Sequence, residues 1–279
     1  MSAPGSALPQ PGPEVAVERL RAFLKRQAGV VIAPGREELI QSRLGPLLRE
    51  RGWSALDALV DGLSAGDPTL QDQVIDLLTT HETSFFRDPP VFAWLRAKGL
   101  PRLLAGRPRH APLRVWSAAC STGQEALSVA IAVLEDQPGQ AIEIVGTDIS
   151  APTVQQAAEA RYTTLAVNRG LGAKQLLRWF VRDGATHWLA RPELRERCSF
   201  IQHNLVADPK PSGAFDLVLL RNVLIYFDDA DRQRAIATVA SALRPGGLLV
   251  LGTAEGLMPI DERILGLERE DNVGFRVRR

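Results

Sequence analysis

"LRVWSAACSTGQEALSVAIAVLEDQ" occupies residues 113–137 and holds the pattern that decides the fold. Its first part, "LRVWSAAC" (113–120), is a strand candidate that runs into a turn of small residues. Its second part repeats apolar residues at helical spacing, at Ala126, Leu127, Ala130, Ile131 and Leu134. The stretch therefore predicts a β-strand, a tight loop and an amphipathic helix.

Strand and helix candidates continue to alternate toward the C-terminus. They are "IEIVGTDIS" (142–150), "APTVQQAAEARY" (151–162), "FDLVLLRN" (215–222) and "ADRQRAIATVASALRPGGLLVLGTAEG" (230–256). This alternation favours a doubly wound α/β domain over residues 113–279. Between about 161 and 198 the alternation stops, which indicates an inserted subdomain. We expect residues 245–247 to form a turn before a strand, and the tail 272–279 to pair antiparallel at a sheet edge.

The first 80 residues carry a helical pattern and no strand candidate. Helices are predicted over residues 14–29, 36–52, 54–66 and 67–81. Ser54 and Asp67 are the candidate N-caps of the last two. We therefore expect a helical domain over 14–80, preceded by a disordered Pro-, Gly- and Ser-rich tail at 1–13. A linker and bridging segment is expected at 81–112.

The composition is that of an ordinary globular protein, with 45% hydrophobic and 23% charged residues. A formal charge of +1 argues neither for nor against a nucleic-acid partner. Cys120 and Cys198 are too few for a disulfide scaffold and suit a reducing compartment. Together with the four histidines they show no metal-like spacing, so we expect no metal. No signal peptide pattern and no apolar run of ~20 residues is present, so we expect a soluble, cytoplasmic monomer without membrane insertion.

The ends of two predicted strands carry the first sign of a ligand site. In an open α/β sheet, ligands bind beyond the carboxyl ends of the strands. The loop 119–123 consists of small residues that allow close approach to its backbone, and it matches neither GxGxxG nor the P-loop. Asp148 follows the next strand, where a carboxylate commonly binds ribose hydroxyls. A tight turn and a turn aspartate are the structural alternatives, but together the two features favour a nucleoside site.

A third strand end is polar where a buried strand should stop. Arg221 and Asn222 follow the apolar run 215–220, and neither side chain is stable in a core without partners. The pattern indicates that a feature at this strand tip binds both residues.

Six segments occur in the order and spacing of a known family. They are "TTHETSFFRD" (79–88), "VWSAACSTGQEALSVAI" (115–131), "GTDIS" (146–150), "HNL" (203–205), "LRNVLIYFD" (220–228) and "LRPGGLLVLGTAE" (243–255). From about residue 15 onward the sequence resembles the CheR family, the chemotaxis methyltransferases that methylate glutamates on chemoreceptors. The resemblance implies an all-helical N-terminal domain. It also implies a seven-stranded, doubly wound Rossmann-like methyltransferase sheet with a small inserted β-subdomain.

The resemblance also implies the cofactor-binding residues, for S-adenosylmethionine (SAM). His81, Thr83 and Arg87 match cofactor contacts in the segment that joins the two domains, although many members carry Asn where His81 stands. Glu125 matches the acid that faces the methionyl end of the cofactor. Asp148 matches the ligand of the ribose.

Further site residues follow from the later segments of the resemblance. Asn204 and Leu205 match the pair beside the adenine. Arg221 and Asn222 match the pair near the methionyl part of the cofactor. Tyr226 matches the aromatic residue that lines the methyl-transfer site, where it and Arg87 are expected to orient the substrate carboxylate.

The implied reaction transfers a methyl group from SAM to receptor glutamates and leaves S-adenosylhomocysteine, with no metal. The implied partner is the cytoplasmic helical domain of methyl-accepting chemotaxis proteins, bound by the helical N-terminal domain. Residues 14–53 carry eight basic and five acidic side chains, an excess that suits an acidic receptor helix. A solvated helical face is an equal alternative. Nucleic acid is a weaker one, because few aromatic residues interleave these charges.

Two alternative functions stay open from the sequence. The first is methyl transfer to a nucleic acid or a small molecule, although amino-methylating enzymes often carry [DN]PP[YFW] after the fourth strand and this chain reads "RNVLIYF" (221–227). The second is a CheR-like module that binds SAM or a receptor without turnover. Whether the inserted subdomain tethers a receptor C-terminal peptide, as in some family members, also stays open.

Overall fold

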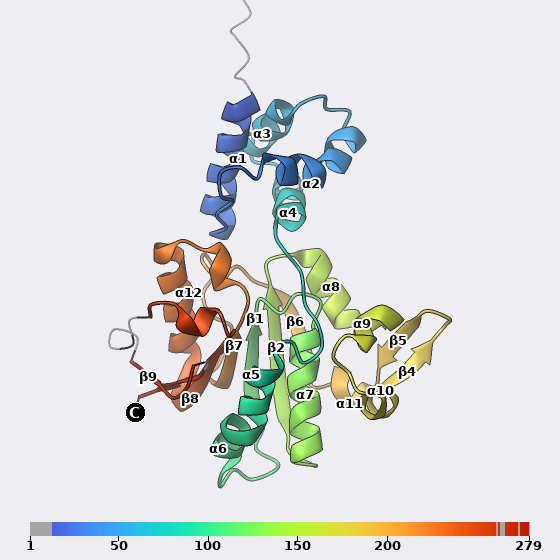
Figure 1. Cartoon of the computed structure of the whole chain (residues 1–279), viewed down its shortest axis with the longest axis vertical. Coiled ribbons are helices and arrows are strands. Elements are labelled where there is room, and N and C mark those ends of the chain that lie inside the picture. Colours follow the sequence, from blue (N-terminus) through green and yellow to red (C-terminus); the bar gives the residue numbers. More distant parts are fainter. Residues whose placement is uncertain (1–12, 261, 263–265, 273, 279) are drawn as a thin grey trace, which may run out of the picture. The chain divides into compact units, whose positions relative to one another are not determined.

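The computed structural model describes residues 13–260, 262, 266–272 and 274–278. The chain divides into two compact units, residues 1–79 and residues 80–279. Both are drawn in Figure 1. Of the tail expected at 1–13, Pro13 is described and begins the first helix, while residues 1–12 lie outside the described part.

The first unit is helical throughout its described part. Its helices are α1 (Pro13–Ala28), α2 (Glu37–Glu50), α3 (Leu56–Ser64) and α4 (Pro68–Leu78). Their apolar stripes face one another, because α1 packs against α3 and α2 packs against α4. The fully buried side chains include Leu20, Leu24, Ile40, Leu44, Leu59 and Leu70. The predicted all-helical N-terminal domain is confirmed.

The two predicted N-caps differ in outcome. Asp67 caps α4, since its Oδ1 accepts hydrogen bonds from the N–H groups of Thr69 at 3.0 Å and Leu70 at 3.2 Å. The prediction for Ser54 is wrong, because Ala55 occupies the N-cap of α3 without a side-chain hydrogen bond. The helix begins at Leu56, whose side chain is buried, and so its N-cap is one residue later than the predicted Ser54.

The second unit is built on a seven-stranded sheet formed by described residues (Figure 1). In spatial order its strands are β6 (Cys198–Gln202), β2 (Ile142–Asp148), β1 (Leu113–Ala118), β7 (Phe215–Leu220), β8 (Leu243–Leu251), β10 (Gly274–Val277) and β9 (Leu267–Arg269). Neighbouring strands from β6 to β8 pair in parallel, and β10 pairs antiparallel with β8 and β9. This sheet confirms the predicted fold class.

Two details of the sheet correct the prediction. The C-terminal strand β10 lies between β8 and β9, so the edge strand is β9 and not the chain end. Residues 245–247 interrupt the pairing inside β8, with Gly246 at a φ of 78°, and do not form a turn before the strand, because α12 (Asp229–Ala242) ends earlier and β8 starts at Leu243. The pairing of β7 with β8 shifts register between Phe215 and Leu217, and this irregularity accommodates the Pro-Gly-Gly sequence.

Helices connect the parallel strands. After β1 comes α7 (Gln124–Asp136), which packs on β1 and β2, and after β2 comes α8 (Ala151–Glu159), which packs on β2 and β6. The segment before the sheet forms α5 (Pro89–Trp94), the π-helical turn η1 (Leu95–Gly99) and α6 (Leu100–Leu104). None of the helices in the described ranges is long and apolar enough to cross a membrane.

The insertion between β2 and β6 forms a small sheet of its own beside α7 (Figure 1). Its antiparallel strands are β3 (Arg161–Thr163), β5 (His187–Ala190) and β4 (Phe180–Asp183), with β5 in the centre. Along the chain, α9 (Thr164–Asn168) and α10 (Ala173–Trp179) lie between β3 and β4, and α11 (Pro192–Arg195) follows β5. Trp179 and Trp188 are both buried here, as core residues.

Candidate cofactor and active site

The loop after β1, residues 119–123, has an unusual backbone. Ala119, Ser121 and Gly123 have φ angles of 60°, 49° and 90°, in the left-handed region that residues with side chains rarely adopt. A Cβ on Gly123 would also lie 3.0 Å from the Ala157 Cβ and 3.2 Å from the Tyr162 hydroxyl. Backbone strain of this kind persists where the surrounding structure enforces it, often at ligand sites.

Asp148 ends β2 beside this loop and is 6% exposed. Its Oδ2 accepts a hydrogen bond from the Ser121 N–H at 2.8 Å, and its Oδ1 accepts one from the Ser150 N–H at 3.1 Å. The bond from Ser150 agrees with the turn-aspartate alternative, whereas the bond from Ser121 joins Asp148 to the small-residue loop. The Thr153 hydroxyl is a third donor, to Oδ1 at 3.4 Å. A carboxylate has about four acceptor positions, so these three donors leave capacity for a ribose hydroxyl.

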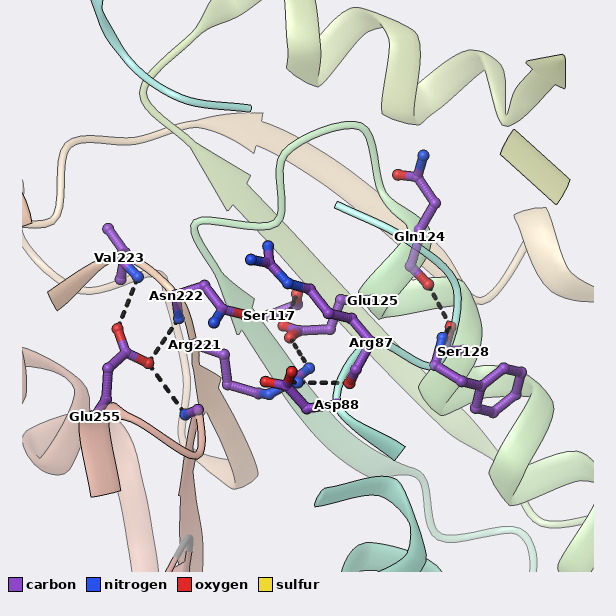
Figure 2. Close-up of polar contacts among 12 residues, drawn as sticks. Arg87, Asp88, Ser117, Gln124, Glu125, Ser128, Arg221, Asn222, Val223 and Glu255 are labelled. Atoms are coloured by element: carbon purple, nitrogen blue, oxygen red, sulfur yellow. Dashed lines mark hydrogen bonds and ion pairs between the residues drawn. The ribbon is translucent and has the colours of Figure 1, made fainter. Parts of the chain in front are cut away.

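Glu125 and Arg221 form a buried ion pair between α7 and the tip of β7 (Figure 2). Arg221 Nη1 donates to Glu125 Oε2 at 2.8 Å, and the Ser117 hydroxyl donates to Glu125 Oε1 at 2.7 Å. The two side chains are 12% and 1% exposed, Glu125 being the more accessible. Glu125 is thereby fixed in place with its carboxylate at the carboxyl end of β1.

Arg221 has further protein partners on the segment before α5. Its Nη2 donates to the backbone oxygen of Arg87 at 2.6 Å and to Asp88 Oδ2 at 3.0 Å. Its guanidinium also lies over the ring of Phe92, 5.5 Å from the centroid. Protein groups therefore already bind both terminal nitrogens of Arg221, so a ligand is not needed to explain them. Its buried Nε has no hydrogen-bond partner among the described residues.

Residues 81–88 are held against this site by backbone and side-chain contacts. The Ser121 hydroxyl donates to the backbone oxygen of His81 at 2.8 Å, and the Phe86 N–H donates to Ser128 Oγ at 2.9 Å. Arg87 Nη1 donates to the backbone oxygen of Glu82 at 2.5 Å. Phe86 and the residue after Arg87 have positive φ angles, 49° and 57°, so the backbone on both sides of Arg87 is strained. Thr83 lies half-buried in the same segment.

The inserted sheet holds the same segment from the other side. Phe85 packs edge-on against Tyr162 and Phe180, with ring centroids 5.1 and 5.5 Å apart. The backbone of Gly170 lies so close to Phe85 that an added Cβ would be 1.8 Å from the Phe85 oxygen. Tyr162 in turn donates to the backbone oxygen of Thr122 at 2.9 Å. The insertion thus joins the segment 81–88 to the loop 119–123.

Asn204 and Leu205 follow β6, next to β2 in the sheet. The Asn204 N–H donates to Asp208 at 2.7 Å, the Asn204 Oδ1 accepts from Val206, and Leu205 is buried. The preceding N–H of His203 donates to the backbone oxygen of Asp148 at 2.8 Å. The end of β6 is therefore joined to the end of β2, as a shared ligand site requires.

Asn222 and Tyr226 lie on the turn that follows β7. Asn222 has a φ of 60°, and Tyr226 ends the short 3-10 helix η2 (Leu224–Tyr226), half-buried. The N–H of Asn222 donates to Glu255 Oε2 at 2.6 Å, from a turn after β8 (Figure 2). The structure thus brings the predicted residues together at the carboxyl ends of β1, β2, β6 and β7 and on the segment 81–88.

Sequence reasoning missed three residues that bind the predicted ones. Ser117 holds Glu125, Asp88 holds Arg221, and Glu255 holds the turn of Asn222. All three stand inside quoted family segments. Asp88 directly follows the predicted Arg87, so a charged residue next to a predicted site residue was an available signal there, whereas Glu255 has no predicted site residue beside it in the sequence. Ser117 lies within a strand and carries no such signal.

Cys120 lies in the loop after β1 and is buried. Desolvation raises the pKa of its thiol well above the usual value, and the nearby Asp148 carboxylate raises it further. Such a thiol stays protonated at neutral pH. The position therefore behaves as a small apolar residue of the loop.

Two family descriptions match the chain. "CheR methyltransferase, all-alpha domain" matches residues 16–79, which covers α2, α3 and α4 and all but the first three residues of α1. "CheR methyltransferase, SAM binding domain" matches residues 81–269, which covers the site described above and most of the sheet.

Curated relatives agree with these matches. "Chemotaxis protein methyltransferase 1" of Pseudomonas aeruginosa is 34% identical over 267 residues, 94% of this chain and 97% of the relative. "Chemotaxis protein methyltransferase Cher2" of Pseudomonas putida is 36% identical over 247 residues, 86% of this chain and 90% of the relative. With the fold and the site in place, these findings confirm the resemblance seen in the sequence: the chain belongs to the CheR family of chemotaxis protein methyltransferases.

Proposed function

We propose that this protein binds SAM and transfers its methyl group to glutamate side chains of chemoreceptors. The products are glutamate methyl esters and S-adenosylhomocysteine. One observation carries the proposal beyond family membership: Glu125, Asp148 and the turn of Asn222 and Tyr226 converge at the carboxyl end of the parallel sheet. This is the place where open α/β sheets bind their ligands.

The residues at this edge fit the chemistry of SAM. The ribose hydroxyls and the methionyl ammonium are hydrogen-bond donors, and the carboxylates of Asp148 and Glu125 are acceptors. The loop 119–123 has only small side chains, so the adenosine can approach its backbone. His81, Thr83, Asn204 and Leu205 border the same edge and complete the proposed cofactor site together with Arg221 and Asn222. When bound, SAM supplies a methyl group on a positively charged sulfur atom.

The substrate glutamate needs orientation more than activation. A glutamate carboxyl has a reference pKa of about 4.3, so it is already ionised at neutral pH and needs no general base. We assign its orientation to Arg87 and Tyr226. A guanidinium has five N–H donors, so the bond of Arg87 to the Glu82 oxygen leaves others for the substrate. Alignment and exclusion of water then account for the rate.

The helical first unit is the proposed docking site for the receptor's cytoplasmic helical domain. Part of its basic excess is paired within the unit: Arg19 with Asp61 at 3.1 Å and Arg21 with Glu37 at 2.7 Å. These pairs fit the alternative of a solvated face for those two arginines. The docking proposal therefore does not rest on these two arginines.

Calorimetry with SAM, followed by transfer of a labelled methyl group to receptor-containing membranes, tests the proposal. We expect SAM to bind and label to enter the receptors, with receptor-free membranes and nucleic acid as controls. Binding without transfer would favour a module without turnover. Label in nucleic acid would favour the alternative substrate class.

A further inference from the structure

Glu255 is a fully buried carboxylate at the start of the short 3-10 helix η3 (Glu255–Leu257), after β8. It accepts hydrogen bonds from four backbone N–H groups. Figure 2 shows the bonds from Asn222 and Val223. Its Oε2 accepts from Asn222 at 2.6 Å and Gly252 at 3.1 Å. Its Oε1 accepts from Val223 at 2.8 Å and Leu224 at 2.7 Å. One side chain thus binds the turn after β7 and the turn after β8.

Burial of a carboxylate costs desolvation free energy, so the groups that it binds indicate its role. Desolvation raises the pKa of the Glu255 carboxyl, and the four N–H donors oppose that rise. Three of these donors are consecutive, and Asn222 is in the left-handed region with φ 60°. Consecutive N–H groups in such a conformation point to one side and form a site for an anion. Glu255 is that anion, supplied by the chain itself.

The approach of the two turns is independently marked by Gly252. A Cβ there would lie 2.7 Å from Glu255 Oε2 and 3.3 Å from Asn222 Nδ2. The absence of a side chain at Gly252 therefore lets the carboxylate and the Asn222 amide approach the backbone. Both turns are shaped around Glu255.

The turn that Glu255 holds is the one that carries proposed site residues. Asn222 is its first residue, and Arg221 precedes it at the end of β7. Tyr226 closes the turn, with its N–H bonded to the backbone oxygen of Val223 at 3.1 Å. Fixing the N–H groups of residues 222–224 therefore fixes the direction in which Asn222 and Tyr226 project.

We infer that Glu255 is a positioning residue for methyl transfer: its carboxylate sets the turn 222–226 so that Asn222 and Tyr226 face cofactor and substrate. The inference rests on the proposed function for the reaction it serves. It differs from a merely structural role in one respect. A substitution that removes hydrogen bonds of Glu255 should lower kcat even under conditions in which the variant is fully folded.

The test compares Glu255→Gln with the matched control Asp216→Asn. Glutamine has nearly the same volume as glutamate, but it replaces one carboxylate oxygen with an NH₂ group. An NH₂ group cannot accept hydrogen bonds, so the two backbone N–H groups that now donate to that oxygen lose their acceptor. Asp216 is also a buried carboxylate, on the same strand β7, and accepts from the Arg114 N–H at 2.9 Å and from Arg244 at 3.0 Å. It lies at the opposite end of that strand from the site.

For Glu255→Gln we expect kcat to fall by about 10- to 100-fold, because small misplacements of reacting groups have effects of that size. KM for SAM should change by a smaller factor than kcat, because Asn222 is only one of the proposed cofactor contacts, and Asp148 and Glu125 lie on other elements. Amide hydrogen exchange of residues 222–224 and 252 should become faster in this variant. Asp216→Asn should lower the melting temperature and leave kcat within about twofold of wild type.

Equal kcat values for the two variants, measured where both are folded, would overturn the inference. So would unchanged exchange at residues 222–224 in Glu255→Gln. If Glu255→Gln does not fold, Gly252→Ala perturbs the same turns without changing a charge, and the same kcat and exchange criteria apply to it. If wild-type protein methylates no receptor, the proposed function fails, but the exchange result still decides whether Glu255 sets the turn.

Discussion

The guanidinium of Arg221 and the carboxylate of Glu125 lie 2.8 Å apart, and 1% and 12% of their side chains are exposed. The pair joins the residue that follows β7 to the first turn of α7, the helix that comes after the loop 119–123. Asp88 adds a third charge to the same guanidinium at 3.0 Å. The proposed cofactor site therefore surrounds a buried arginine that belongs to the protein's own ion network.

Arg221→Ala should lower the free energy of unfolding by about 3–5 kcal/mol, because it leaves two partly buried carboxylates without their cation. Urea unfolding measures the change. Arg161→Ala is the control: it pairs with Asp183, and the two side chains are 44% and 43% exposed. Such an exposed pair contributes about 0–1 kcal/mol. Similar losses in the two variants would show that burial does not strengthen the Arg221 network.

Asp148→Asn should weaken SAM binding by about 10- to 100-fold, the effect of losing a charged hydrogen-bond acceptor worth about 1.5–3 kcal/mol. The amide nitrogen would also face the N–H of Ser121 or Ser150, both now bonded to carboxylate oxygens. Calorimetry gives the affinity, with Asp61→Asn in the helical unit as the control. An unchanged affinity for SAM would favour the turn-aspartate alternative at Asp148.

Gly170→Ala should weaken SAM binding by about tenfold, although Gly170 lies on the inserted subdomain. Its φ is 105°, and an added Cβ would lie 1.8 Å from the Phe85 oxygen, so the segment 81–88 must move. Gly184→Ala is the matched control, because Gly184 has φ 69° in the same subdomain but no heavy atom within 4 Å of the added Cβ. It should cost about 1 kcal/mol of stability and leave the affinity unchanged. Equal affinities in the two variants would show that the insertion does not hold the segment in place.

Both thiols should be unreactive in the folded protein. Burial raises the pKa of Cys198 to about 12 and raises that of Cys120 well above its usual value. A thiol reagent near pH 8 should modify the native chain far more slowly than the unfolded chain. Rapid native labelling of Cys120 would contradict the assigned burial of the loop.

The same raised pKa values make stability depend on alkaline pH. The unfolded thiols lose their protons near pH 8.5, before the folded ones. Their contribution to stability is therefore complete below about pH 8.5 and falls by up to about 1.4 kcal/mol per thiol for each further pH unit. Urea unfolding between neutral and alkaline pH measures this slope. A Cys120→Ala, Cys198→Ala double variant should have a flatter pH dependence.

The elements of the fold that have a local periodic pattern of apolar residues could be predicted from the sequence. The strand, loop and helix at 113–137 follow from local periodicity, and Asp67 signals its helix by a local cap. The edge strand β9 has three residues, too few for a period of two to be visible. Ser54 failed as a cap because burial of Leu56, a tertiary effect, determines where α3 starts.

The candidate site was predictable as a set of positions but not as a network. Strand ends identify Asp148 and Arg221, because polar residues there follow apolar runs. The pairing of Arg221 with Asp88 spans 133 residues of chain, and no local pattern reports it. No local sequence pattern reports the close approach of Gly170 to Phe85 either, because this contact depends on how the inserted subdomain packs against the segment 81–88.

The most direct test of the central claim is mass spectrometry of a chemoreceptor after incubation with the protein and SAM. Wild-type protein should add methyl groups to glutamate side chains of the receptor's cytoplasmic domain, as base-labile esters. Arg87→Ala should abolish this methylation while the chain stays folded. Methyl groups found only on other residues or on nucleic acid, or full activity in Arg87→Ala, would contradict the account.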